Sequence, residues 1–375
     1  MDTRPEADVC VIGGGPAGLA GAIALRLEGF SVDLFECAVP PIDKACGEGL
    51  MPDTLRALRE LGVSIPATAG FPFRGVRFAG GGFSAVADFP NEVALGLRRT
   101  TLHGCLMDRA IELGVALHWG TKGVRLVGDS LSVNGRLIRP KLILGADGQH
   151  SPIRRRAGLD RTSRKTQRYG FRRHYRLAPW SPYMEVHWGA RSQIYITPVS
   201  ETEVCVAMTT RDPTIRLEQE LAEFPTIRAC LSRAQPCSPE LGALTVSRTL
   251  ACVSKGQLAL IGDASGSVDA ITGEGLGLSF RQAPALARAF KMGDLSQYRE
   301  AHRKLARRPA LMASLLLVLE KHRVFRARAL GSLAKNPDVF GAFLAIHAGE
   351  GSFRSLCSPR LLNLGLAFLA TRGAA

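Results

Sequence analysis

Apolar residues near the N-terminus are spaced as in a βαβ unit. Residues 9–12 form a continuous apolar run, residues 19–27 carry apolar side chains at helical spacing before Gly29, and residues 31–36 form a second strand-like run. A buried strand, a helix ended by glycine and a second strand produce this pattern. We therefore expect an α/β layer at the start of the chain.

The middle of the chain alternates between helical and β-rich patterns. Helical spacing predicts helices over 53–62 and 101–113, and short alternating runs around consecutive glycines predict a hairpin over 73–89. A small β-meander should then lead back to a strand at 141–145. The strands expected in this meander are residues 115–117, 123–127, 131–133 and 137–138.

The second half of the chain changes from strands to helices. Residues 168–210 are predicted to be mostly strands, a short helix is expected near 217–224, and a further strand at 258–261. From Leu276 to the C-terminus the spacing is helical. The pattern predicts a nucleotide-binding α/β layer that is interrupted twice by β-rich segments and followed by a helical tail.

Composition narrows the class of protein. A chain of 375 residues with 46% apolar residues can bury one large core or two coupled cores. Its apolar runs are too short to cross a membrane, and the first strand begins too early to leave room for a secretory signal. The nine cysteines lack metal-site spacing, which predicts free thiols, no metal centre and a cytoplasmic location.

Positive charge is concentrated in two segments. The formal net charge is +15, with ten basic residues and one acid in 151–176, and twelve basic residues and three acids in 281–328. Such surfaces either keep a protein in solution or dock an acidic partner, such as an anionic substrate, a carrier protein or a membrane face. No nucleic-acid motif accompanies the charge, so we expect no nucleic-acid partner.

A glycine-rich turn follows the first predicted strand. Gly13 permits a tight turn, Gly15 lets the backbone approach a pyrophosphate, and Gly18 allows the helix to pack closely on the strand. The helix start presents amide groups and its positive dipole end to phosphates. Glu36 ends the next strand, where an acid accepts hydrogen bonds from an unphosphorylated ribose. The residues assigned to this site are Gly13, Gly15, Pro16, Ala17, Gly18 and Glu36.

Two later segments complete a flavin site. Asp147 and Gly148 follow the strand predicted at 141–145, and Gly262 and Asp263 follow the strand predicted at 258–261. Each segment alone is a weak signal. The glycine turn, the Asp-Gly pair and the Gly-Asp pair, in this order and at this separation, leave few alternatives to an FAD-dependent oxidoreductase.

These motifs resemble those of the FAD-dependent family that contains p-hydroxybenzoate hydroxylase-type monooxygenases and geranylgeranyl reductases. The resemblance covers residues 8 to about 290. It implies that Asp147 and Gly148 lie near the pyrophosphate and that Asp263 binds ribityl hydroxyls. It also implies that Arg99 contacts FAD, with Arg98 as its rival.

The resemblance implies an α/β fold with a glutathione reductase-like FAD-binding Rossmann domain, an interleaved β-sheet substrate domain and a helical C-terminal tail. We expect the FAD-binding domain to comprise residues 1–65, 95–165 and 255–295, the substrate domain 66–94 and 166–254, and the helical region 296–375.

Two segments resemble geranylgeranyl reductases rather than hydroxylases. Residues 44–50 resemble the reductases' Cys-Gly loop beside the isoalloxazine ring, and residues 272–277 resemble their Gly-Glu-Gly turn, which opens a helix toward the pyrimidine end of the flavin. Hydroxylases of the family usually have Ala-His after Gly-Asp-Ala, where this chain has Ser265 and Gly266. The resemblance adds to the FAD-binding residues Cys46, Gly47, Gly273, Gly275 and Leu276.

Three residues are candidates for catalysis: Cys46, His187 and Tyr195. Cys46 either faces the flavin, where it donates a proton or tunes the ring, or is a small apolar residue of a tight loop. The resemblance places the strands of His187 and Tyr195 over the flavin. His187, Trp188 and Tyr195 therefore either line the pocket or pack within the sheet.

The leading expectation for function is a flavin monooxygenase that hydroxylates or epoxidises a bulky apolar or carrier-held small molecule. One alternative is an isoprenoid double-bond reductase, and another is a flavoprotein that modifies side chains of an acidic partner polypeptide. Because one GxGxxG motif is present, NAD(P)H, if used, should bind transiently, or the electrons should come from a partner. In the tail, Leu311, Leu315, Val318 and Leu319 share a helix face that packs on the substrate domain or makes peripheral membrane contact.

Overall fold

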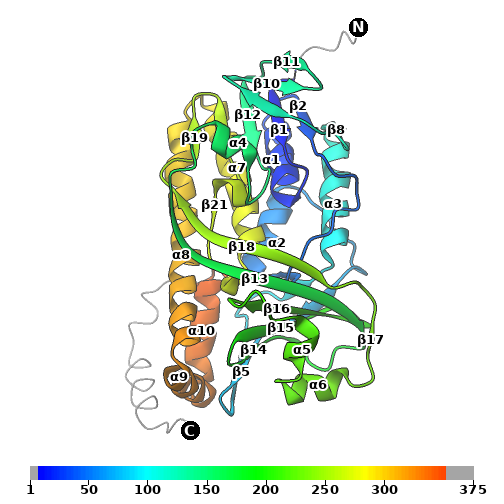
Figure 1. The fold of residues 1–375 in the computed structure, drawn as a ribbon, viewed down its shortest axis with the longest axis vertical. Helices are drawn as coiled ribbons and strands as arrows, with labels where there is room; N and C mark the ends of the chain where they lie inside the picture. The colour runs from blue at the N-terminus through cyan, green and yellow to red at the C-terminus, as the bar shows by residue number, and fades with distance from the viewer. Residues whose placement is uncertain (1–6, 352–375) are drawn as a thin grey trace.

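The computed structural model describes residues 7–351, and its first layer is a six-stranded sheet that carries the glycine turn (Figure 1). β1 lies at the centre with β12 and β2 on either side, both parallel to it. The edge strand β19 runs antiparallel to β20. In spatial order the strands are β19 (Ser254–Lys255), β20 (Leu258–Leu260), β12 (Leu142–Gly145), β1 (Val9–Ile12), β2 (Val32–Phe35) and β8 (Ala116–His118).

The position of β8 corrects one prediction. Residues 115–117 were expected in the small meander, but β8 pairs in parallel with β2, with Asp33 opposite Ala116. Alternation in the sequence identifies a strand but does not name its neighbour, and a parallel partner is remote in sequence. The meander contains only β9 (Arg125–Val127), β10 (Ser130–Val133) and β11 (Arg136–Ile138).

Helices cover this sheet and form the main core with it. α1 begins at Pro16, which suits a first helical position because it needs no amide donor there. Leu19 and Ile23 on α1 are completely buried, and each contributes about 1.5–3 kcal/mol by leaving water. The helices of this layer are α1 (Pro16–Leu27), α2 (Pro52–Glu60), α3 (Arg99–Glu112), α4 (Pro152–Arg156) and α7 (Gly275–Lys291).

The second layer is a nine-stranded sheet that crosses the molecule below the first layer (Figure 1). Most of its strands pair antiparallel, whereas β14 and β5 are parallel. The predicted hairpin over 73–89 is present as β5 and β6. The strands are β5 (Gly75–Gly80), β6 (Phe83–Asp88), β13 (Thr162–Arg176), β14 (Tyr183–Trp188), β15 (Ser192–Ser200), β16 (Glu203–Thr210), β17 (Gln235–Pro236), β18 (Leu241–Leu250) and β21 (Gly266–Ser267).

Short elements connect the two layers. A three-stranded sheet contains β3 (Gly49–Leu50), β7 (Ala94–Gly96) and β4 (Phe71–Phe73). The outer face of the large sheet is covered by α5 (Leu217–Leu221) and α6 (Pro225–Leu231), whose apolar residues pack with Ile194 and Ile196. Two 3₁₀ helices, Gly262–Ser265 and Ala270–Thr272, precede α7.

The C-terminal part is helical, as predicted, through α8 (Leu295–Lys321), α9 (Arg323–Lys335) and α10 (Pro337–His347). α9 and α10 pack on β6 and lie beside the large sheet in Figure 1. The part of the tail predicted to be helical over 352–375 lies outside the described residues. Among the helices of residues 7–351, none is both long and apolar enough to span a bilayer.

Candidate flavin site

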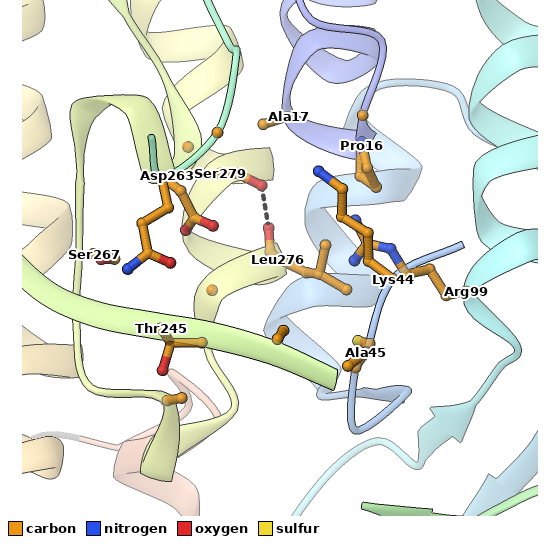
Figure 2. A pocket seen from close by; sticks show the side chains of 18 of the residues that line it. Pro16, Ala17, Lys44, Ala45, Arg99, Thr245, Asp263, Ser267, Leu276 and Ser279 are labelled. Atoms are coloured by element: carbon orange, nitrogen blue, oxygen red, sulfur yellow. Dashed lines mark hydrogen bonds between the residues drawn. The ribbon is translucent and has the colours of Figure 1, made fainter. Parts of the chain in front are cut away.

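A cavity of about 680 Å³ lies between the two layers and collects the predicted motifs. It is lined by the glycine turn, the 44–49 loop, the ends of β12 and β20, the start of α7 and part of the large sheet. Figure 2 shows Pro16 and Ala17 at the start of α1 above the cavity, with Leu276 of α7 below them. Segments that are remote in sequence therefore meet around one space.

The glycine turn has the geometry predicted for it. Gly13 has φ of 111°, and a Cβ there would lie 2.3 Å from the carbonyl oxygen of Ala146. A Cβ on Gly18 would lie 1.8 Å from the carbonyl oxygen of Gly13, so only glycine fits this contact. At Gly15, by contrast, a Cβ would meet no atom within 4 Å. The turn is closed on its protein side and open on its cavity side.

Glu36 is fixed at the rim of the turn. Its carboxylate accepts a hydrogen bond from Gly14 N at 2.7 Å and another from Ala38 N at 2.8 Å. Burial alone would raise the pKa of Glu36, but these amide bonds outweigh it and lower the pKa. Glu36 is therefore an ionised acceptor at the cavity, which suits a ribose diol.

Two further carboxyl groups face the cavity from the strand ends. Burial raises the pKa of Asp147, and its Oδ1 is buried without a hydrogen-bond partner. Enclosure by protein also raises the pKa of Asp263, against the opposing charges of Arg99 and Lys44. In Figure 2, Asp263 lies on one side of the cavity and the two cations on the other.

These features fit FAD. The open glycine backbone and the start of α1 suit a pyrophosphate, Glu36 suits the adenosine ribose, and Asp263 suits the ribityl hydroxyls. The unpartnered Oδ1 of Asp147 and the unpartnered Nε of Arg99 are polar atoms that a ligand can satisfy. Bound FAD would thus be held by Gly15, Glu36, Asp147 and Asp263 among others.

The structure brings most of the predicted residues to this cavity. Arg99 lines it, whereas its rival Arg98 pairs with Glu203. Gly18 does not line it, because Gly13 lies between. The predicted residues that do line it are Gly13, Gly15, Pro16, Ala17, Glu36, Cys46, Gly47, Arg99, Asp147, Gly148, Tyr195, Gly262, Asp263, Gly273, Gly275 and Leu276.

The structure separates the remaining catalytic candidates. Tyr195 lines the cavity, and its hydroxyl donates to Ile271 O at 3.2 Å. His187 is not brought to the cavity: its Nε2 lies 2.8 Å from Glu185 Oε2, and its strand neighbour Ile194 belongs to the outer core. Trp188 is buried and stacks with Arg326 of α9.

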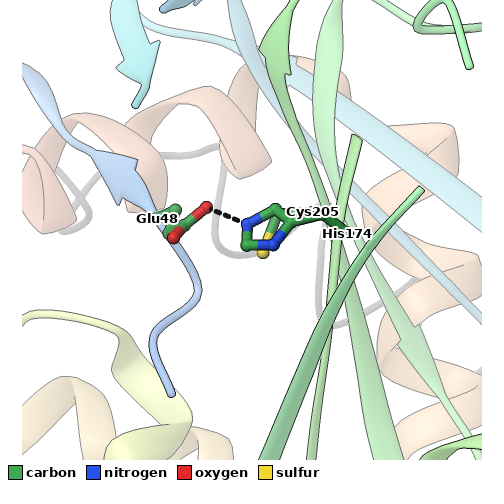
Figure 3. Close-up of side chains that lie close together, drawn as sticks. All are labelled: Glu48, His174 and Cys205. Carbon is green, nitrogen blue, oxygen red and sulfur yellow. Dashed lines mark hydrogen bonds and ion pairs between the residues drawn. The ribbon is translucent and has the colours of Figure 1, made fainter. Parts of the chain in front are cut away.

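Sequence reasoning missed a buried cluster beside the 44–49 loop. Glu48, His174 and Cys205 have ligand-type atoms within 4.8 Å of one another (Figure 3). His174 Nε2 lies 2.6 Å from Glu48 Oε2. Glu48 has φ of 58°, a left-handed conformation that is strained for a residue with a Cβ. The sequence signal for Glu48 was an acid among glycines, but nothing in the sequence linked it to His174, 126 residues away.

A second missed group is Glu274, directly before α7. It is 5% exposed, with Arg308 Nη2 at 3.6 Å and His347 Nδ1 at 3.7 Å from its carboxyl oxygens. Burial raises the pKa of Glu274 to about 7, against the lowering effect of Arg308, whose guanidinium also pairs with Asp53. Burial also lowers the pKa of His347 to about 4. All three residues of the Gly-Glu-Gly turn therefore line the cavity, and the carboxyl group of Glu274 also lies close to Arg308 and His347 of the helical part.

The fold and the cavity together define an FAD-dependent oxidoreductase. More specifically, the chain belongs to the FAD binding domain family, whose model matches residues 6–293. The resemblance expected from the motifs is thus confirmed.

Relatives fall into two groups by coverage. Menaquinone reductase of Mycobacterium tuberculosis (strain ATCC 25618 / H37Rv) is 28% identical over 327 residues, which is 79% of each chain. Hispidin-3-hydroxylase of Neonothopanus nambi is 29% identical over 197 residues, 48% of this chain and 47% of the hydroxylase.

Solved structures share the fold over nearly the whole chain. The flavin-dependent brominase Bmp2 has a TM-score of 0.80 at 18% identity, covering 96% of this chain and 98% of that one. A geranylgeranyl bacteriochlorophyll reductase-like protein from Thermoplasma acidophilum has a TM-score of 0.71 at 20% identity, covering 96% and 95%. At these identities the likeness establishes the fold alone.

Proposed function

We propose that this protein is an FAD-dependent reductase that saturates a carbon–carbon double bond in an isoprenoid lipid chain. The observation that carries the proposal is that the Cys46 loop and the turn of Gly273 and Gly275 line the same cavity. These are the two segments that resemble geranylgeranyl reductases. The reductase relative also matches 79% of this chain, whereas the hydroxylase matches 48%.

The cavity wall beyond the Cys46 loop supports an apolar substrate. Met51, Met184, Tyr195 and Ala207 line the cavity and also belong to one apolar core cluster. An isoprenoid chain gains about 25 cal/mol for each Å² of apolar surface that it removes from water. Tyr195 keeps its hydroxyl bonded to Ile271 O, so its ring presents apolar surface without an unsatisfied donor.

Different residues of the chain have different roles around the cofactor. When bound, FAD supplies the two electrons of the reduction. The N-terminus of α7, beginning at Gly275, points amide groups and a positive dipole end at the cavity, where they stabilise negative charge. The Cys46 thiol lies at the cavity and can hold a proton there. The apolar wall excludes water from the chain that is to be reduced.

The exposed face of α8 suits delivery of a lipid. Leu311, Leu315 and Val318 of α8 are 43%, 40% and 45% exposed, and their spacing places them on one helix face. Lys321 and Arg323 follow at the helix end. Apolar side chains beside cations are suited to peripheral contact with an anionic bilayer. We propose that this face makes peripheral contact with a membrane.

A product analysis tests the proposed reaction. Purified holoprotein would be reduced under anaerobic conditions and mixed with a menaquinone that carries a polyprenyl chain. We expect the polyprenyl chain to gain two hydrogen atoms, measured as a mass increase that persists after air has reoxidised any quinol to the quinone. Unchanged menaquinone from fully reduced protein would contradict the reductase proposal.

A flavin monooxygenase, which was the leading expectation from the sequence, is the second candidate, because the hydroxylase relative matches about half of the chain. In air, the substrate would then gain one oxygen atom, and the amount of oxygen consumed would equal the amount of product formed. Replacing the reductant with NADPH or NADH in either assay shows whether a nicotinamide that binds transiently supplies the electrons.

A further inference from the structure

Gly14, the middle glycine of the turn, is held at both of its backbone polar groups by side chains. Its N–H donates to Glu36 Oε2 at 2.7 Å, and its carbonyl oxygen lies 2.9 Å from His103 Nε2. Glu36 lines the cavity, whereas His103 belongs to α3, 89 residues further along the chain, and does not line the cavity. The turn is therefore fixed from the cavity rim and also from within the protein.

The protein side of Gly14 is tightly enclosed. His103 is 2% exposed, and its ring centroid lies 5.9 Å from that of Trp119. A Cβ on Gly14 would lie 2.4 Å from a ring carbon of Trp119 and 2.8 Å from Glu36 Cβ. The carbonyl oxygen of Gly14 is thus buried, and His103 is the residue that satisfies it.

The contact determines which nitrogen of His103 carries the proton. A carbonyl oxygen can only accept, so the nitrogen that faces it must be protonated. Burial lowers the pKa of His103, and the nearby charge of Arg99 acts in the same direction. The ring is therefore neutral at about pH 7, with its one proton on Nε2. His103 supplies a donor to the turn without placing a positive charge in the core.

A fixed Gly14 carbonyl also fixes the direction of the next N–H group. The Gly14–Gly15 peptide bond is trans, and in a trans peptide the C=O and N–H groups point in opposite directions. Since the carbonyl of Gly14 points at the buried His103, the N–H of Gly15 points the other way. Gly15 lines the cavity, and a Cβ on it would meet no atom within 4 Å. The N–H of Gly15 therefore faces the open side of the turn.

The spacing along α3 explains how His103 reaches this position. Arg99 and His103 are four residues apart in the helix, so they lie on the same face of it. Arg99 lines the cavity from the first turn of α3, and His103, one turn further along, is buried against the glycine turn. One helix face thus contributes a cation to the cavity and a donor to the backbone beside it.

We propose that His103 is a positioning residue for FAD: its Nε2–H holds the Gly14 carbonyl so that the N–H of Gly15 is aimed at the anionic pyrophosphate. A run of glycines is conformationally free, so an external contact is needed to keep this amide in one direction. An amide that is oriented before the ligand arrives loses less freedom on binding. This role concerns cofactor binding and is the same whichever reaction the flavin performs.

Two substitutions of matched length isolate the donor. His103→Gln places an amide N–H near the position of Nε2, whereas His103→Met is similar in length and has no donor. FAD dissociation from each purified holoprotein would be followed by flavin fluorescence anisotropy on serial dilution. We expect His103→Gln to bind FAD as tightly as the wild type does. His103→Met should bind FAD about 10–100-fold more weakly, which corresponds to one hydrogen bond to a charged group.

Phosphorus NMR separates the aiming of the amide from simple packing. The pyrophosphate resonances of bound FAD would be recorded at saturating FAD. We expect them to move toward the values of free FAD in His103→Met and to stay at the wild-type values in His103→Gln. Wild-type FAD binding by His103→Met would overturn the proposal, as would wild-type phosphorus shifts in that variant. Equal weakening of FAD binding in both variants would assign the imidazole to packing alone and would also overturn it.

A measurement on the wild-type holoprotein keeps the proposal testable if His103→Met does not fold. Nitrogen NMR of isotope-labelled histidine shows which ring nitrogen carries the proton, and the signals of His103 are those missing from the His103→Gln spectrum. We expect a neutral ring with its proton on Nε2 at about pH 7. A proton on Nδ1 alone would overturn the proposal, because Nε2 could then not donate to the Gly14 carbonyl.

Discussion

Glu274 provides a quantitative test of the electrostatics beside the cavity. Its pKa is raised from 4.5 to about 7, mainly because it is buried. Each pKa unit corresponds to about 1.4 kcal/mol, so ionising Glu274 in the folded protein costs about 3 kcal/mol relative to the unfolded chain. Between these two pKa values the unfolded chain has released its proton while the folded protein retains it. The contribution of Glu274 to the free energy of unfolding is therefore fully present below about pH 4.5 and is lost as pH rises through about 7.

Glu274→Gln removes this ionisation and keeps the shape of the side chain. We expect the variant and the wild type to have similar free energies of unfolding near pH 4, and the variant to be more stable by about 3 kcal/mol near pH 8. Urea unfolding of the holoprotein across this range measures the difference. Titration of His347 is common to both proteins and largely cancels. Exposed Glu60→Gln is the control and should show no such trend. A constant difference between Glu274→Gln and wild type at all pH values would refute the reasoning.

Three further changes probe the glycine turn, a buried ion cluster and the outer face of α8. Gly18→Ala should lower the free energy of unfolding by at least about 1–3 kcal/mol and reduce bound FAD, because the added Cβ has no room. A lower melting temperature and a lower ratio of flavin to protein absorbance would show these two effects. Arg168→Met should cost about 3–5 kcal/mol in urea unfolding, because Arg168 is 1% exposed and bonds Asp269 and Glu320, each at 2.5 Å. Leu315→Glu should weaken sedimentation with anionic vesicles and leave FAD content unchanged; equal sedimentation would exclude this face as the contact.

Much of the fold was predictable because its elements have strong local signals. The βαβ unit has a buried strand, Pro16 at a helix start and glycines where the backbone must turn. The helical tail was equally clear through its apolar spacing. Residues 116–118 of β8 were misplaced because the partner strand β2 is about eighty residues away, and local alternation carries no information about it.

The site was predictable where the backbone itself makes the contact. Gly13 and Gly18 have to be glycine, so the sequence records their geometry. His187 shows where this reasoning stops: alternation gives its relation to Glu185, but only packing decides which face of β14 meets the cavity. His174 had no local signal at all, since its role depends on Glu48 in a distant loop.

The cavity also has a consequence for how the protein is made. Its lining begins at Ile12 and ends at Gln282, whose side-chain oxygen accepts from Gly262 N at 3.0 Å. During synthesis the N-terminal parts of a chain emerge and fold first. The glycine turn is therefore exposed to the cell long before the start of α7 exists to close the opposite wall. We therefore expect FAD to bind late in biogenesis. A chain interrupted before Gln282 would expose the apolar wall of an incomplete cavity, which chaperones and proteases can recognise.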